Sequence, residues 1–209
     1  MKKLFLSLIL LIGGSCLFAM PINWYLSGSY SFGTYTMKTE GDRVDMLSNG
    51  GLVTLKVIPD CKLIGGFVDI GYYSPFAYVE TNDGSKYKID TADFDMKMIF
   101  FAAGGFEYLE KVNDTLTISL GIGVDVHVMG FLYNIVGETI ESLGLVLAPE
   151  LMFKLNDNLY IDIGSRVSFD FLPLMFEITN GYNSTSYTGK YSLLSSKVNI
   201  GLTWNINSK

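Results

Sequence analysis

The sequence predicts an all-β protein, an eight-stranded antiparallel up-and-down transmembrane β-barrel. Three observations lead to this fold. Apolar and polar residues alternate in eight segments, the connections between these segments alternate long and short, and the charged side chains within them fall on one parity. Short turns on one side and longer loops on the other are typical of up-and-down membrane barrels. Closure also removes the sheet edges that lipid could not satisfy.

The segment 115–128 shows the alternation most clearly. Its apolar parity holds Leu116, Ile118, Leu120, Ile122, Val124, Val126 and Val128. Its polar parity holds Thr117, Ser119, Gly121, Gly123, Asp125 and His127. A period of two residues indicates a β-strand with one apolar face and one polar face. A tilted strand crosses a bilayer with about 9–11 residues, so this segment is long enough.

The strands that precede this segment are expected at 22–32, 51–58, 63–73 and 93–108, each with the same alternation. A polar stretch, 37–50, connects the first two, and 59–62 is a tight turn. The long connection 74–91 contains Asn82-Asp83-Gly84, which favours a hairpin extending beyond the membrane.

The strands that follow are expected at 143–153, 159–171 and 191–206. Long connections are expected at 129–142 and 172–190, and a tight turn at 156–158. Pro149 lacks a backbone N–H, which predicts a bulge at that point of its strand.

The last hairpin but one has a register that pairs charges. Placing Lys154 directly opposite Asp162 also places Glu150 directly opposite Arg166, so that two complementary pairs form at once. Cβ atoms of residues facing each other across strands lie about 4.5–5.5 Å apart, within reach of these side chains. We therefore predict this register for the hairpin.

Length and composition limit the number of domains, the kind of membrane segment and the possible partners. The chain has 209 residues, a formal net charge of −6, 14 % aromatic and 17 % charged residues, and a mean hydropathy of +0.31. This length fits one domain. Beyond the first residues, no stretch supplies the roughly 18 consecutive apolar residues of a spanning helix. The acidic balance argues against a nucleic-acid partner.

The N-terminus predicts a secretory signal peptide at residues 1–19, followed by the barrel at 20–209. Lys2 and Lys3 precede an apolar run, and Ala19 suits the position before the cut. The alternative is that Cys16 becomes a lipidated cysteine. If Cys16 leaves with the leader, only Cys61 remains, and no internal disulfide can form.

Aromatic residues lie near the strand ends, as in the two interfacial girdles of membrane barrels. One group is expected on the side of the short turns: Trp24, Phe106, Tyr108, Phe153 and Trp204. The other is expected on the side of the long loops: Phe32, Tyr72, Phe94, Phe169 and Phe171. A soluble lipocalin-like barrel is the structural rival, because alternation alone does not say which face lies inside.

The polar parity defines a structural network inside the barrel. Its members are Lys56, Asp69, Asp95, Lys97, Glu107, Asp125, His127, Glu150, Lys154, Asp162, Arg166, Asp170 and Lys197. An eight-stranded barrel has room inside only for side chains, and buried charges must pair. The mixed signs therefore favour a core plugged by ion pairs, with a narrow water or ion path as the alternative.

The chain resembles small eight-stranded bacterial outer-membrane barrels: the transmembrane domain of outer-membrane protein A, and the OmpX and OmpW types. The resemblance covers residues 20–209 and rests on the strand pattern and the last strand. That strand ends Leu202-Thr203-Trp204-Asn205-Ile206, similar to the family's C-terminal assembly signal, but it lacks a terminal Phe. The resemblance implies the outer membrane as the location, membrane lipid as a partner and a monomer.

Membrane-embedded lipid A deacylases and phospholipases also resemble this fold and carry a His-x-Ser pair on a strand. His127 is the only histidine, and Met129 stands two residues later, so the nucleophile is missing. No dinucleotide or phosphate-loop motif and no clustered His/Cys ligands appear. The sequence therefore predicts no catalytic residue, no cofactor and no metal.

Three functions remain open at this stage. The first is a non-enzymatic, structural or adhesin-like barrel whose loops contact an extracellular ligand or a host surface. The segment 176–190, with Tyr182, Tyr187 and the following Tyr191, supports it because such residues make adaptable contacts. The second is a narrow porin-like or hydrophobic small-molecule channel, as OmpW-type barrels suggest. The third is envelope-lipid hydrolysis.

Overall fold

The computed structural model describes residues 22–39, 42–59, 64–82, 85–90, 93–133, 136–180, 183–187 and 191–206. The predicted signal peptide, its alternative at Cys16, and Cys61 lie outside these residues. Within the described part, no helix is long and apolar enough to cross a membrane.

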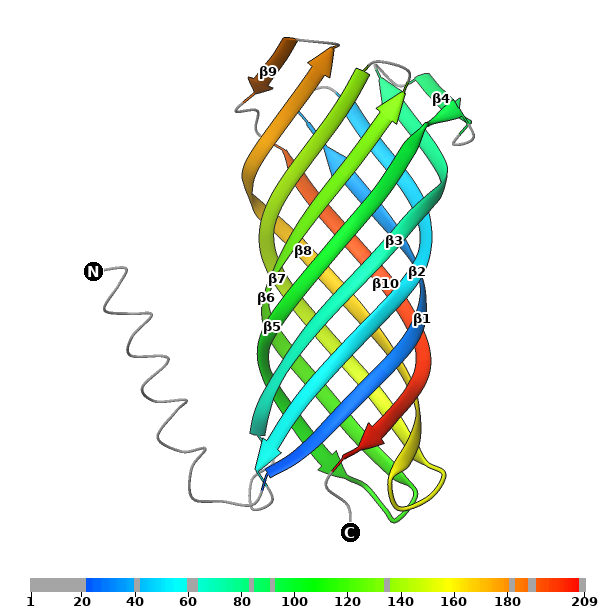
Figure 1. Ribbon diagram of the computed structural model, residues 1–209, viewed down its shortest axis with the longest axis vertical. Helices are drawn as coiled ribbons and strands as arrows, with labels where there is room; N and C mark the ends of the chain where they lie inside the picture. Colours follow the sequence, from blue (N-terminus) through cyan, green and yellow to red (C-terminus); the bar gives the residue numbers. More distant parts are fainter. Residues whose placement is uncertain are drawn as a thin grey trace, which may run out of the picture.

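The protein is a closed eight-stranded antiparallel β-barrel (Figure 1). Its strands are β1 (Ile22–Lys38), β2 (Asp42–Pro59), β3 (Ile64–Asn82), β5 (Met96–Lys111), β6 (Leu116–Tyr133), β7 (Val136–Lys154), β8 (Leu159–Asn180) and β10 (Ser192–Asn205). Each pairs with the next along the chain, and β10 closes the barrel by pairing with both β8 and β1. The predicted fold class is therefore confirmed.

Two short strands lie outside this cycle, both at the upper end in Figure 1. β4 (Ser85–Ile89) pairs only with β3, and β9 (Asn183–Tyr187) pairs only with β8. We call this the extension end. The opposite end carries the turns 112–115 and 155–158, and we call it the turn end. The hairpin extension expected near Asn82 is present as β3 and β4.

The strands are longer than predicted, and the long connections are largely strands themselves. The stretch 37–50 belongs to β1 and β2 apart from three residues, and 129–142 belongs to β6 and β7 apart from two. The expectation of long loops was wrong because strands outside a bilayer need no apolar face. There, polar residues join the backbone hydrogen-bond ladder as readily as apolar residues do.

The turns are built by asparagine side chains. Asn113 Oδ1 accepts hydrogen bonds from the backbone N–H groups of Thr115 and Leu116, both at 2.8 Å. Asn156 Oδ1 accepts from the N–H groups of Asn158 and Leu159, both at 2.9 Å. An Asn side chain that bonds its own backbone two and three residues on stabilises a tight reversal.

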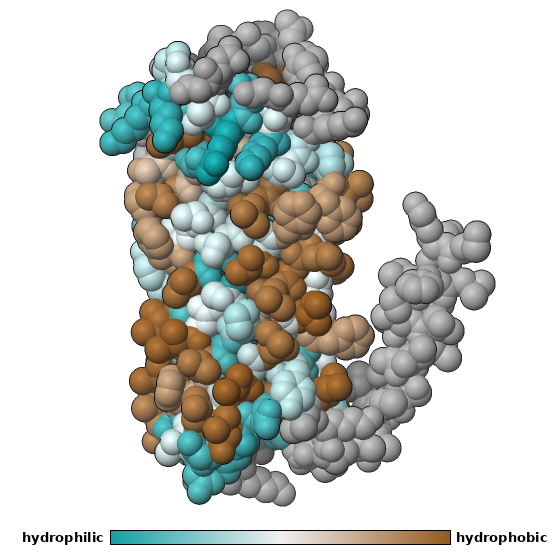
Figure 2. Space-filling view, turned by 180° about the vertical axis from the view of Figure 1, so that it is seen from behind, coloured by the Kyte–Doolittle hydropathy of each residue, from teal (hydrophilic) through white to brown (hydrophobic). Residues whose placement is uncertain are grey.

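The apolar parity faces outward, as predicted. On β6 the side chains of Ile118, Leu120, Ile122 and Val124 are exposed, whereas Ser119 and Asp125 are buried. Figure 2 shows hydrophobic side chains over the middle and lower parts of the barrel and hydrophilic ones at its upper end. An outward apolar band with charges turned inward is the reverse of a soluble globular protein.

Nine of the ten predicted girdle aromatics are exposed: Trp24, Phe32, Tyr72, Phe106, Tyr108, Phe153, Phe169, Phe171 and Trp204. Phe94 is the exception and was wrongly placed. It lies just before β5 and packs against the interior, with ring centroids 6.0 Å from both Tyr78 and Phe131. Phe94 has the same parity as the outward residues of β5, but it precedes that strand, so the alternation does not fix the direction of its side chain.

The predicted register of β7 and β8 was wrong by two residues. Lys154 lies opposite Tyr160, and Glu150 lies opposite Gly164. A two-residue shift keeps every side chain on its face, so the hydrophobic pattern cannot detect it. The turn decides the register instead, because the Leu155 N–H reaches the Leu159 carbonyl at 2.8 Å.

The predicted bulge at Pro149 is also absent. The β7–β8 ladder skips Ala148 and Pro149 but resumes in the same register. The register shifts lie higher up, between Glu141 and Ser142 and between Leu143 and Gly144. Pro149 therefore removes ladder pairing without adding a residue.

Candidate functional site in the barrel interior

The structure buries ten of the thirteen residues expected inside the barrel. These ten are Lys56, Asp69, Glu107, Asp125, His127, Glu150, Asp162, Arg166, Asp170 and Lys197, each at most 3 % exposed. The other three are at strand ends: Asp95 is exposed, and Lys97 and Lys154 are partly exposed. Lys154 bonds Asp157 of its own turn at 2.7 Å rather than the expected Asp162.

A network of ion pairs fills the half of the interior nearer the turn end. Lys56 Nζ lies 2.7 Å from Glu150 Oε1 and 2.9 Å from Glu107 Oε1. Arg166 Nε lies 2.6 Å from Asp69 Oδ2, and its Nη2 lies 3.5 Å from Glu150 Oε2. Glu150 thus links the two cations. Each of these carboxylates is satisfied by a cation, as a buried charge requires.

Hydroxyl groups complete this network. Ser119 donates a short hydrogen bond to Glu107 Oε1, and Thr54 Oγ1 donates to Asp69 Oδ1 at 2.6 Å. Asp162 has no cation at this distance and accepts instead from Ser27 at 3.0 Å and Thr203 at 2.9 Å. Serine and threonine on the polar parity are therefore donors to the buried acids.

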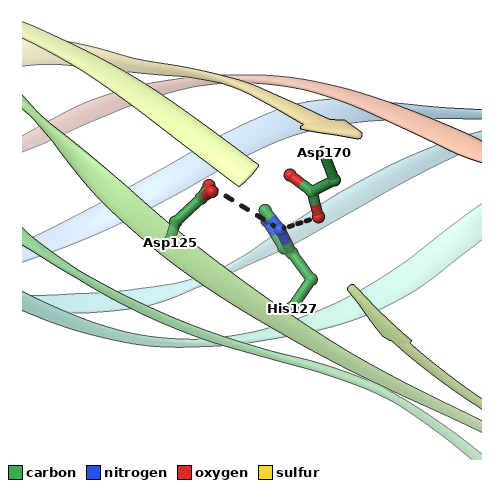
Figure 3. A group of neighbouring side chains, drawn as sticks. All are labelled: Asp125, His127 and Asp170. Carbon is green, nitrogen blue, oxygen red and sulfur yellow. Dashed lines mark hydrogen bonds and ion pairs between the residues drawn. The ribbon is translucent and has the colours of Figure 1, made fainter. Parts of the chain in front are cut away.

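A second cluster lies nearer the extension end (Figure 3). His127 Nδ1 is 2.9 Å from Asp170 Oδ2 and 3.8 Å from Asp125 Oδ2. The other ring nitrogen, Nε2, is 3.2 Å from Lys197 Nζ. Lys197 in turn lies 3.5 Å from the ring centroid of Phe101. A desolvated ammonium over an aromatic face is stabilised by the ring quadrupole.

The register explains why the acids of this cluster meet. Asp125 on β6 and Asp170 on β8 both pair with Gly144, on the strand between them. The absence of a side chain at Gly144 leaves room for the Asp170 carboxylate. Sequence reasoning found no cluster of metal ligands because Asp170 lies 43 residues from His127. The only local signal was Asp125 and His127, two residues apart on one face of a strand.

The interior carries an excess of negative charge. Among the described residues, six buried carboxylates face three buried cations, with the His127 imidazole beside them. Mixed signs were predicted, but the ion pairs do not balance. With His127 neutral, the excess is two charges in the network nearer the turn end and one in the second cluster.

An apolar and aromatic layer closes the interior above this second cluster. It includes the following buried side chains: Tyr35, Val44, Met46, Tyr73, Ile99, Met129, Phe131, Ile140, Tyr191 and Leu193. Tyr191 also donates hydrogen bonds to the backbone carbonyls of Glu141 and Met175, which join β7 and β8. Water-filled channels expose the side chains that line them, and these side chains are buried.

Outside the membrane-spanning part, the surroundings shift the pKa values of two carboxyl groups. Burial raises the pKa of Glu138, and the nearby charge of Glu80 raises it further. Partial burial raises the pKa of Asp45 too, but hydrogen bonds from Arg43 and Thr36 outweigh it and hold the pKa below its usual value. Arg43 Nε lies 2.9 Å from Asp45 Oδ2.

The chemistry open to His127 is narrow. Ser142 donates its hydrogen bond to Asp170 Oδ2 rather than to a histidine nitrogen. A nucleophile needs a base within hydrogen-bond reach, and here the base is bonded to a carboxylate and an ammonium. The cluster can hold a proton or a cation, and it has no serine positioned as a nucleophile.

No family model matches the sequence, and no curated protein matches it. Solved structures do match. Neisserial surface protein A superposes with a TM-score of 0.59 at 12 % identity, covering 88 % of this chain and 97 % of that one. The outer membrane protein OprG from Pseudomonas aeruginosa gives 0.59 at 10 % identity, with 90 % and 98 % covered.

A major outer membrane protein from Thermus thermophilus gives a TM-score of 0.55 at 15 % identity, covering 86 % of this chain and 99 % of that one. Each match spans nearly the whole neighbouring chain. At these identities the likeness concerns the backbone arrangement alone. This chain therefore has the fold of the small outer-membrane β-barrels.

Proposed function

We propose that this protein is a non-enzymatic barrel of the outer membrane that holds a rigid set of strand extensions at the cell surface. The burial of the charged interior is the observation that carries the proposal. Ten ionisable side chains inside the barrel are at most 3 % exposed, so they close the lumen instead of lining a path. In this proposal the barrel anchors the strand extensions in the membrane.

The length of the strands supports a display role. A strand crosses the membrane with about 9–11 residues. β6 has 18 residues and β8 has 22, so both continue well beyond that length. The pairs β3–β4 and β8–β9 extend the same end further. Paired strands hold a contact surface more rigidly than free loops, which favours binding of an extracellular ligand or a host surface.

The non-enzymatic part rests on the position of His127. It is fully buried, contacts Asp170 and Lys197, and lies beneath the apolar layer. Neither a lipid nor an external substrate reaches it in this arrangement.

A narrow channel is the second candidate, favoured by the acid excess inside the barrel. Single-channel recording in planar bilayers separates the two functions. A closed anchor gives no conductance steps above the bare bilayer, between pH 5 and pH 8. Regular cation-selective steps would overturn the anchor and establish the channel.

Display at the surface has its own test. Cells expressing the full chain should attach to host-cell monolayers more than cells in which 177–190 is replaced by a glycine-serine linker. The matched control replaces residues 85–89 in the same way. Equal attachment by all three strains, at equal surface levels, would contradict the role of the β8–β9 extension.

A further inference from the structure

The second cluster has the geometry of a metal site. One potential ligand atom from each of Asp125, His127 and Asp170 lies within 4.8 Å of the other two. The two closest separations from His127 Nδ1 are 2.9 Å and 3.8 Å. Ligand atoms about 2.1 Å from a tetrahedral ion are about 3.4 Å apart. The two separations from His127 would change by about half an ångström or less, and the separation between the two carboxylate oxygens, at most 4.8 Å, by up to about 1.4 Å.

The Asp125 carboxylate points toward His127, 3.8 Å from its Nδ1 (Figure 3). The Ser168 hydroxyl also interacts with it, but in the described residues neither group has a hydrogen bond of ordinary geometry. Asp125 is 1 % exposed, so bulk water does not reach it. Asp170 Oδ1 is likewise without a partner. A buried carboxylate in this condition is unfavourable unless a positive charge accompanies it. Asp69 and Glu150, in the other network, each have such a charge.

The absence of a side chain at Gly144 lets Asp170 pack directly against the backbone of β7. A Cβ atom built on Gly144 would overlap Asp170 Oδ1 and lie 2.7 Å from Asp170 Cα. The register shift between Leu143 and Gly144 falls at the same place. Bulges commonly redirect a side chain beside a functional site. Here the shift sets Asp170, rather than Phe171, opposite Gly144 on the inner face.

We propose that Asp125, His127 and Asp170 bind one divalent transition-metal ion of the zinc class above Gly144. One imidazole nitrogen and two carboxylate oxygens suit borderline ions such as Zn²⁺. Mg²⁺ and Ca²⁺ prefer a larger set of oxygen ligands. Lys197 occupies the Nε2 side of the imidazole, so Nδ1 is the nitrogen that faces both carboxylates.

The charge balance improves on binding. With His127 neutral, two carboxylates and Lys197 leave the cluster with an excess of one negative charge. Ligation at Nδ1 moves the ring proton to Nε2, where Lys197 gives up one of its own protons, so about one proton is released for each ion bound. The excess negative charge is then neutralised.

To test this, the full chain is refolded in detergent micelles with and without Zn²⁺, and free metal is removed by gel filtration. Bound zinc and the unfolding midpoint are then measured. The wild type should retain about one zinc ion per chain and unfold at a higher temperature, because an ion that binds only the folded state stabilises it. Mg²⁺ at the same concentration should do neither.

Asp125→Asn removes one ligand charge with little change in shape and should abolish zinc retention. Asp162→Asn is the matched control, an equally buried aspartate outside the cluster, and it should retain zinc. If either variant fails to fold, the absorption spectrum of Co²⁺ in the wild type decides, since a nitrogen and oxygen ligand set gives visible bands. A folded wild type that retains no zinc, or equal retention by Asp125→Asn, would overturn the proposal.

Discussion

Replacing Arg166 by methionine would leave Asp69 charged and buried, with Thr54 as its remaining donor. Glu150 keeps Lys56 at 2.7 Å, so the loss falls on Asp69 rather than on Glu150. Breaking a buried pair from one side lowers the free energy of unfolding by about 3–5 kcal/mol. Urea unfolding of the barrel refolded into lipid vesicles measures it.

The double variant Arg166→Met, Asp69→Asn is the control for this prediction. It removes the stranded charge and should recover most of the stability. Equal losses in the single and double variants would mean that packing, and not the ion pair, is what Arg166 contributes.

The outward face has a residue-scale test of its own. Ile122 is 60 % exposed near the middle of the apolar band, and arginine there should lower the free energy of unfolding by about 2–4 kcal/mol in a bilayer. Val112 is similarly exposed, at 53 %, but lies in a turn outside the band. Val112→Arg should change the stability by less than about 0.5 kcal/mol. Equal effects at both positions would mean that lipid does not surround Ile122.

At this scale the sequence predicts the face of a residue better than its partner. The inward position of Glu150 and Arg166 follows from parity alone. Their strongest contacts, to Lys56 and Asp69, reach across strands that are not neighbours along the chain. Those contacts depend on the tilt and closure of the barrel, which no local pattern encodes.

Among the elements, the extension formed by β6 and β7 should have a stability that depends on pH. The folded pKa of Glu138 is raised by burial and by Glu80, so the folded state holds this proton more tightly than the unfolded chain. Stability from this effect is fully present below the ordinary glutamate pKa and is lost as pH rises through the folded value. Hydrogen exchange of amides 131–140, corrected for intrinsic rates, should show more protection at pH 4 than at pH 7.

Glu138→Gln should remove this difference, whereas Glu110→Gln, at the exposed turn end, should preserve it. Protection that still changes with pH in Glu138→Gln would assign the effect to another group.

β4 is predicted to be dispensable for folding. It pairs only with β3, so replacing residues 85–89 by a glycine-serine linker leaves every pairing between the eight barrel strands in place. The variant should keep its heat-modifiable gel shift and its unfolding midpoint. A variant that no longer folds would show that the β3–β4 hairpin belongs to the barrel's stable core.

The existence of all eight strands could be predicted, but their lengths could not. Alternation marks a strand only where one face meets lipid and the other the interior. Beyond the bilayer the outer face meets water, so 129–142 looked like a loop although it forms strands. The β7–β8 register escaped prediction for a related reason. The Asn156 turn sets it, whereas the charges suggested another register of the same parity.

For the whole molecule, the same pattern predicted the closed barrel and the direction of its faces. It did not predict the meeting of Asp125, His127 and Asp170. This meeting arises from the order in which the strands surround the lumen and from the absence of a side chain at Gly144. The molecule is thus an apolar cylinder around a buried, acid-rich core.

The reaction of single cysteines with a small cationic thiol reagent tests this description most directly. The protein is refolded into lipid vesicles with Cys16→Ser and Cys61→Ser as background, carrying Val112→Cys, Ile122→Cys or Ser119→Cys. Val112→Cys in its turn should react rapidly. Ile122→Cys should be protected by lipid and Ser119→Cys by the packed interior, where Ser119 is 1 % exposed. All three should react at one rate after unfolding. Rapid reaction of Ser119→Cys in the folded barrel would reveal a water-filled lumen, rapid reaction of Ile122→Cys would place the apolar band in water, and either result would contradict the account.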